Sequence, residues 1–152
     1  MKRLLTLTAG LVIVNIETGN EQSLVDTGYA PAWSPDNGRW IAYRKGAPDQ
    51  SEIWIVAAGG GTPRKLTDGS APHWGQTEDE LYYMSMTGET LCGIAPTTTA
   101  QSRTILSLED SVDGIISDGH LVAYSAAGWL KIVEAPSGKV LHHLPLPGEK
   151  GL

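Results

Sequence analysis

Short apolar runs alternate with clusters of Gly, Pro, Asp and Asn along the whole chain. The run at Glu52–Val56 reads Glu-Ile-Trp-Ile-Val, and it is followed by the triplet Gly59–Gly61. Short runs rich in β-branched and aromatic residues, bounded by turn residues, predict strands. No window carries apolar residues at helical spacing over several turns, so the pattern predicts an all-β protein.

The strand pattern also repeats. Ala30–Trp33 reads Ala-Pro-Ala-Trp and returns 41 residues later at Ala71–Trp74 as Ala-Pro-His-Trp. Tyr43, Tyr83 and Tyr124 follow the same period, at intervals of 40 and 41 residues. Four short strands in a repeat of about 40–45 residues are typical of one blade of a β-propeller.

The first full repeat resembles the TolB-type propeller repeat in particular. The matching segments are Pro31–Gly38, Trp40–Tyr43, Glu52–Val56 and Pro63–Thr67. This repeat also occurs in the propeller domains of prolyl-oligopeptidase-like peptidases. It is similar to the WD-repeat blade but lacks the Trp-Asp pair that closes one. The resemblance implies a β-propeller of four-stranded blades and, through TolB, a cell-envelope interaction role.

The period divides residues 1–152, interpreted as one domain, into about three and three-quarter blades. We expect a partial blade at 1–28, full blades at 30–67, 71–108 and 112–146, and a short tail at 147–152. An open arc exposes strand edges and blade flanks that a ring would cover. The chain could close alone as a four-bladed ring, pair with a second copy in a ring of eight, or be a fragment of a longer protein. We favour the homodimer.

Acidic residues recur in the turns that should share one face of the propeller. These are the loops that enter the first strand of each blade and the loops that join its second and third strands. Acids repeated around a central opening focus a negative potential, although Asp also favours turns for its own backbone hydrogen bonds. His73 lies on an innermost strand, where it could line the central channel. The candidate partner-binding residues are Asp26, Tyr29, Asp49, Asp68, His73, Glu89, Asp110 and Asp113.

Composition narrows the classes of function. Eleven Lys and Arg against 17 Asp and Glu give a net charge of −6, which disfavours nucleic-acid binding. The single cysteine excludes a disulfide framework. We find no metal-ligand pattern, no cofactor motif, and no Gly-x-Ser-x-Gly nucleophile elbow, so no catalytic residue, metal or cofactor is expected. The apolar run near the N-terminus is too short for a transmembrane helix.

The sequence therefore predicts a non-enzymatic propeller module that binds a protein or peptide at an acidic loop face, with a basic peptide as one candidate. A propeller lyase or hydrolase that uses channel-lining His and Asp is one alternative, and a structural fragment of a larger propeller is another. Resemblance to TolB implies a periplasmic location. However, the segment after Met1 lacks a convincing cleavage site for a signal peptide, so a cytoplasmic location stays open.

Overall fold

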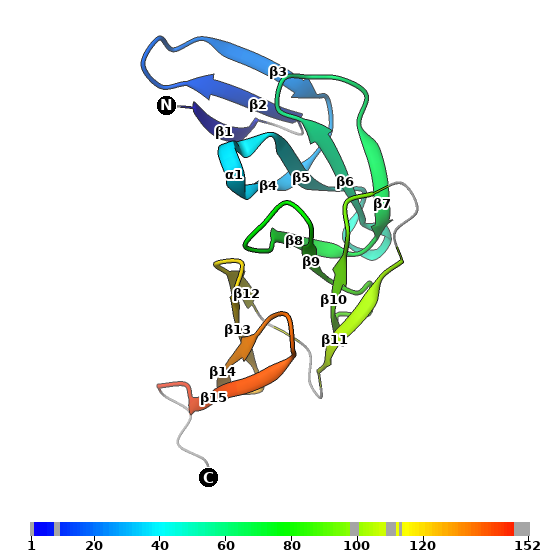
Figure 1. Cartoon of the computed structure of the whole chain (residues 1–152), viewed down its shortest axis with the longest axis vertical. Coiled ribbons are helices and arrows are strands. Elements are labelled where there is room, and N and C mark those ends of the chain that lie inside the picture. The colour runs from blue at the N-terminus through cyan, green and yellow to red at the C-terminus, as the bar shows by residue number, and fades with distance from the viewer. Residues whose placement is uncertain (1, 8–9, 98–100, 109–111, 113, 148–152) are drawn as a thin grey trace.

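The computed structural model is an arc of four small antiparallel sheets (Figure 1). It describes residues 2–7, 10–97, 101–108, 112 and 114–147. Each sheet follows the chain in simple up-and-down order, and successive sheets follow one another from the N-terminal to the C-terminal end of the arc. The predicted all-β propeller of about three and three-quarter blades is confirmed.

Each sheet is one blade, and its strands are numbered in chain order. The first blade has three strands, which are β1 (Lys2–Leu7), β2 (Gly10–Asn15) and β3 (Glu21–Val25). The second has four, which are β4 (Tyr29–Trp33), β5 (Trp40–Lys45), β6 (Glu52–Ala57) and β7 (Arg64–Asp68). The third comprises β8 (Ser70–Trp74), β9 (Leu81–Met84), β10 (Thr90–Ile94) and β11 (Arg103–Ser107). The fourth comprises β12 (Gly114–Ser117), β13 (Leu121–Ala126), β14 (Trp129–Glu134) and β15 (Lys139–Pro145).

The core lies between neighbouring blades rather than inside any one of them. Because side chains alternate along a strand, each middle strand presents one row to the preceding blade and one row to the next. Leu11 and Ile13 of the first blade pack against Ile41 and Tyr43 of the second, and all four are buried. Burying one such side chain contributes roughly 1.5–3 kcal/mol. Burial also raises the pKa of the Tyr43 hydroxyl to about 12.

The innermost strands β4, β8 and β12 lie side by side along the inside of the arc. The indole Nε1 of Trp74 donates a hydrogen bond to the carbonyl of Ala32 (3.0 Å), which links β8 to β4. Both strands contain a bulge at an Ala-Pro step, where Ala30 and Ala71 adopt positive φ angles of 47° and 50°. The repeat present in the sequence is thus a repeat of backbone geometry as well.

Two turns are more regular than the sequence predicts. The segment after β4 forms one helical turn, α1 (Pro35–Gly38), and the β5–β6 connection contains a 3-10 turn, Pro48–Gln50. Proline at the first helical position favours both, since its φ is preset and its missing N–H is not needed there. None of the helices in the described segments is long and apolar enough to cross a membrane.

Candidate functional site

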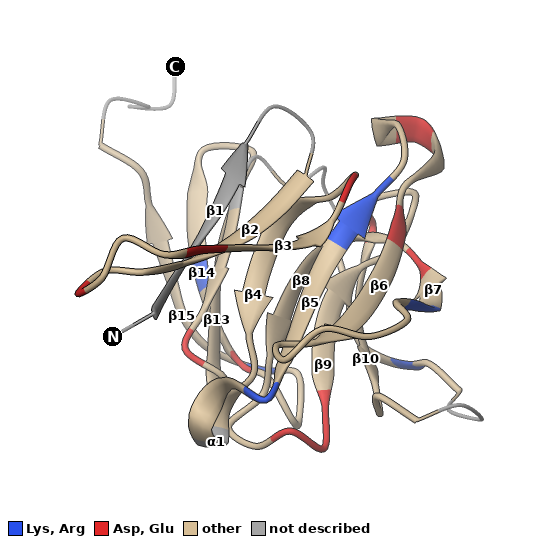
Figure 2. Ribbon diagram, turned by 90° about the horizontal axis from the view of Figure 1, so that it is seen from above, with Lys and Arg blue, Asp and Glu red and all other residues tan. Residues whose placement is uncertain are grey.

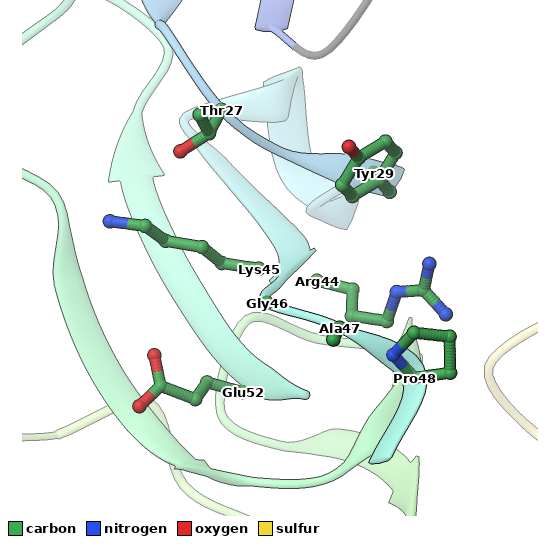
Figure 3. Close-up of a pocket in the computed structure, with 8 residues that line it drawn as sticks. All are labelled: Thr27, Tyr29, Arg44, Lys45, Gly46, Ala47, Pro48 and Glu52. Carbon is green, nitrogen blue, oxygen red and sulfur yellow. The ribbon is translucent and has the colours of Figure 1, made fainter. Parts of the chain in front are cut away.

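The loops that enter the innermost strands and the hairpins between second and third strands form one face, which we call the entry face. In the second blade this face contains a depression of about 560 Å³, the entry hollow (Figure 3). All of its lining comes from the stretch between the end of β3 and the start of β6. The lining residues are Thr27, Tyr29, Arg44, Lys45, Gly46, Ala47, Pro48 and Glu52.

Arg44 is positioned by the innermost strand. It is the cross-strand partner of Tyr29, and its guanidinium carbon lies 5.4 Å from the centroid of the Tyr29 ring. Figure 3 shows the guanidinium extending into the space between the Tyr29 ring and Pro48. Arg44 Nε is buried and has no hydrogen-bond acceptor among the described residues. Stacking on an aromatic face stabilises a guanidinium but leaves its N–H groups free to bind an anion.

Lys45 points the other way from the same strand (Figure 3), as alternation requires. Its Nζ lies 4.5 Å from the centroid of the Trp54 ring. Trp54 in turn donates its indole N–H to Glu52 (2.8 Å). Lys45 forms no ion pair with any residue that the structure describes, and its ammonium lies over Trp54, on the other side of the strand from the Arg44 guanidinium.

Glu52 is the carboxylate of the entry hollow, and it is already engaged. Lys65 Nζ lies 2.7 Å from Glu52 and 2.7 Å from Asp68. The hydrogen bond from Lys65 lowers the pKa of the Glu52 carboxyl, and hydrogen bonds to Asp68 and Glu52 raise the pKa of the Lys65 ammonium. The Lys65 ammonium therefore partly compensates the charge of the Glu52 carboxylate.

The predicted acids that the structure describes lie on the entry face, but they do not converge on one point. Asp26 borders a second depression of about 360 Å³ beside the entry hollow, which it shares with Lys45 and Trp54. Asp49 is exposed in the 3-10 turn and Glu89 is exposed in the β9–β10 hairpin. Asp68 is exposed and paired with Lys65. Asp110 and Asp113 lie outside the described residues.

The charge of the entry face is mixed rather than uniformly negative around the second blade. Figure 2 shows acidic and basic segments side by side where β5 ends and β6 begins. The sequence pattern did not indicate Arg44 or Lys45, because the candidate residues were identified mainly from acids that recur at the blade period. Neither cation recurs at that period, because the positions 41 residues later are Ser85 and Met86. An adjacent cation pair at the end of a strand was the available signal.

His73 lies at the other end of the innermost strands. It lines a depression of about 280 Å³, the exit hollow, together with Trp33, Trp74 and Asp118. His73 Nδ1 is 2.9 Å from the carbonyl oxygen of Ala71. The Asp118 carboxylate accepts backbone N–H groups of the following turn, from His120 and Leu121, and these hydrogen bonds lower its pKa.

The structure thus separates His73 from the entry-face acids that the sequence grouped with it. Convergence of His73 with Asp113, which the enzymatic alternative requires, involves a residue outside the described part of the chain. Among the described residues no group of three His, Cys, Asp or Glu side chains is arranged to hold a metal ion. Cys92 is buried, and burial raises its pKa, so it is not an activated thiol.

The comparisons with known proteins place the fold. No protein-family model matches the sequence, and no curated protein matches it. The TM-score is 0.72 with the structure of a putative TolB from Agrobacterium tumefaciens, at 14% identity over 95% of this chain and 60% of that one. For the β-propeller domain of Cps50 (Swd1) from Myceliophteria thermophila the TM-score is 0.69, at 11% identity over 90% and 49%.

The structure of a nidogen/laminin complex matches with a TM-score of 0.67, at 12% identity over 90% of this chain and 55% of that one. Enzymes are matched too, among them the dihydro-heme d1 dehydrogenase NirN, with a TM-score of 0.63 and 14% identity over 95% and 35%. This chain spans about half the length of the propeller structures it matches first.

The fold is that of a β-propeller, present here as an arc of blades. The expected similarity to TolB-like and WD-repeat propellers is confirmed at the level of fold.

Proposed function

We propose that this chain is a non-enzymatic module that binds a protein or peptide partner on its entry face. The entry hollow carries the proposal, because it combines an aromatic ring, two cations and a carboxylate in a depression of about 560 Å³. Binding sites are typically concave surfaces with a few convergent polar groups. One matched structure is that of a nidogen/laminin complex, which supports protein recognition on this fold.

The acids around the entry hollow contribute to the proposed interface. Asp26, Asp49 and Glu89 are exposed on the entry face, and they attract basic groups of a partner during its approach. Propellers also include enzymes, so the fold alone decides neither binding nor catalysis. The binding proposal rests on the entry hollow and its charged surround.

A peptide array probed with the purified chain tests the proposal, followed by affinity measurements on the peptides it retains. We expect Asp26→Asn combined with Asp68→Asn to lower the affinity of the chain for those peptides at least threefold. The matched control is Asp79→Asn, an exposed carboxylate on the opposite face in the β8–β9 loop, which should leave affinity unchanged. Retention of full affinity by the double variant for every peptide would show that the entry face is not the binding surface.

We also propose that a second copy of the chain packs against the fourth blade. The surface concerned is the face of its sheet that is turned away from the third blade, which we call the outer side of the fourth blade. Register places Ile116, Ala123 and Ile132 on one face of that sheet, opposite the buried row that contains Val122 and Val133. Ile116 is 70% exposed, and it lines an apolar depression. Matched propellers continue beyond the arc that this chain covers, which supports another blade as the occupant of this surface.

A further inference from the structure

We infer that the entry hollow binds a carboxylate group of the partner, with Arg44 as the residue that receives it. This inference rests on the proposed function and names the chemistry of its ligand. It departs from the expectation of a purely basic partner, since the Arg44 guanidinium lines the hollow.

The state of the Arg44 side chain is the first argument. A buried N–H of a charged group normally has an acceptor, because leaving it unsatisfied costs about 1–3 kcal/mol or more. Arg44 Nε is buried without an acceptor, and no ion pair with a described residue compensates the guanidinium. Yet the side chain is held in place against the Tyr29 ring. The guanidinium is oriented against Tyr29 on the wall of the entry hollow, so its outer N–H groups, rather than the buried Nε, can receive an anion that enters the hollow.

The charge balance of the hollow is the second argument. Its lining contains two cations, Arg44 and Lys45, and one carboxylate, Glu52. The Glu52 carboxylate is occupied by the Lys65 ammonium and the Trp54 indole, at 2.7 Å and 2.8 Å. Net positive charge is therefore left on the walls, in a protein whose overall charge is −6.

The surrounding acids restrict which anion can approach. A planar carboxylate matches the guanidinium fork in a bidentate geometry. A peptide with many acids would be repelled by the exposed carboxylates of Asp26 and Asp49 on the entry face. The preferred ligand is therefore one carboxylate flanked by basic residues, supplied either by an acidic side chain or by a chain terminus.

The probe is the capped peptide acetyl-Lys-Gly-Glu-Gly-Lys-amide, titrated into the intact chain by calorimetry. We expect the matched peptide with Gln in place of Glu to bind at least tenfold more weakly. The Gln peptide with a free C-terminus separates the two sources of the carboxylate, since recovery of affinity would assign the hollow to a chain terminus. Inorganic phosphate serves as a competitor, and displacement by phosphate but not by acetate would overturn the assignment to a carboxylate.

Two arginine variants separate a binding role from a structural one. Arg44→Met keeps the aliphatic stem beside Tyr29 and removes the unsatisfied guanidinium. The Arg44→Met variant should bind the Glu peptide at least tenfold more weakly, while its midpoint of urea unfolding stays the same or rises. Arg39→Met is the control, because Arg39 lies at the opposite end of the blade and is paired with Glu78 at 2.7 Å. It should leave peptide affinity unchanged.

These experiments separate failure of the carboxylate site from failure of the proposed binding function of the entry face. Equal binding of the Glu and Gln peptides, or equal effects of the two arginine variants, would overturn the carboxylate site. If peptides from the array still lost affinity in the Asp26 and Asp68 double variant, the entry face would keep its proposed function. Loss of stability in Arg44→Met without loss of peptide affinity would mark Arg44 as structural and overturn the inference.

Discussion

Gly28 and Gly69 show how one residue of the repeat permits the packing of a whole blade. They stand 41 residues apart, each directly before an innermost strand, and each lies under a tyrosine ring of the second strand. A Cβ at Gly28 would be 2.7 Å from the ring of Tyr43, and a Cβ at Gly69 would be 2.5 Å from the ring of Tyr83. The absent side chain therefore makes room for the buried tyrosine.

We expect Gly69→Ala to lower the free energy of unfolding by about 2 kcal/mol or more, in the range of overpacked core substitutions. Gly69 also has a positive φ of 152°, and the backbone oxygen of Met84 is as confining as the ring, at 2.7 Å. Urea unfolding followed by tryptophan fluorescence measures the change. Gly59→Ala is the control, because a Cβ at Gly59 would meet nothing within 4 Å and its φ is not positive. A similar effect at both positions would contradict the packing argument.

Between elements, individual hydrogen bonds join the last three blades in succession in the described part of the chain, among them Arg64 to the carbonyl of Pro96 and Arg103 to the carbonyl of Pro136 (3.2 Å). The hydrogen bond from Trp74 to Ala32 joins two innermost strands, and Glu78 accepts hydrogen bonds from Ser34 (3.0 Å) and Arg39 (2.7 Å) of the preceding blade. Apolar packing between the sheets supplies the larger area of contact. The blades are consequently aligned by directional contacts as well as by apolar packing.

Trp74→Phe removes the inter-strand hydrogen bond to the carbonyl of Ala32 while keeping a ring in the core. We expect the free energy of unfolding to fall by about 1–3 kcal/mol. The control is Trp129→Phe, since Trp129 is 41% exposed and its indole N–H has no acceptor among the described residues. Urea midpoints of the two variants compare them, and equal shifts would show that ring volume, not the hydrogen bond, is what matters.

The strands themselves were predictable because alternation and turn residues mark them locally. The run Glu52–Val56, for instance, is extended by one residue in β6, to Ala57. The Tyr29–Arg44 contact was not predictable. Continuing the Ala32–Ala42 register without interruption would pair Tyr29 with Lys45, and the bulge at Ala30 shifts the partner to Arg44. A positive φ at an alanine leaves no trace in the pattern of apolar residues, so this part of the candidate site needed the structure.

At the scale of the molecule, the outer side of the fourth blade is an apolar sheet face next to solvent. We expect the 16.2 kDa chain to scatter light as a dimer at tens of micromolar, because burial of this face is favourable. Ile116→Lys should yield a monomer, since a charge cannot be buried there without a partner. Val140→Lys, on the opposite side of the same sheet and already 46% exposed, should remain dimeric. A wild-type chain that is monomeric at every concentration would refute the second-copy proposal.

The entry hollow is built within a single blade, from residues between Thr27 and Glu52. None of its walls belongs to the outer side of the fourth blade, where the second copy is proposed to pack. Filling one hollow therefore changes no contact at that distant surface. Two hollows in a dimer would saturate independently, with the same intrinsic affinity and no cooperativity between them. Such an assembly would gain its strength from avidity, by holding two ligand groups of one partner at a fixed separation.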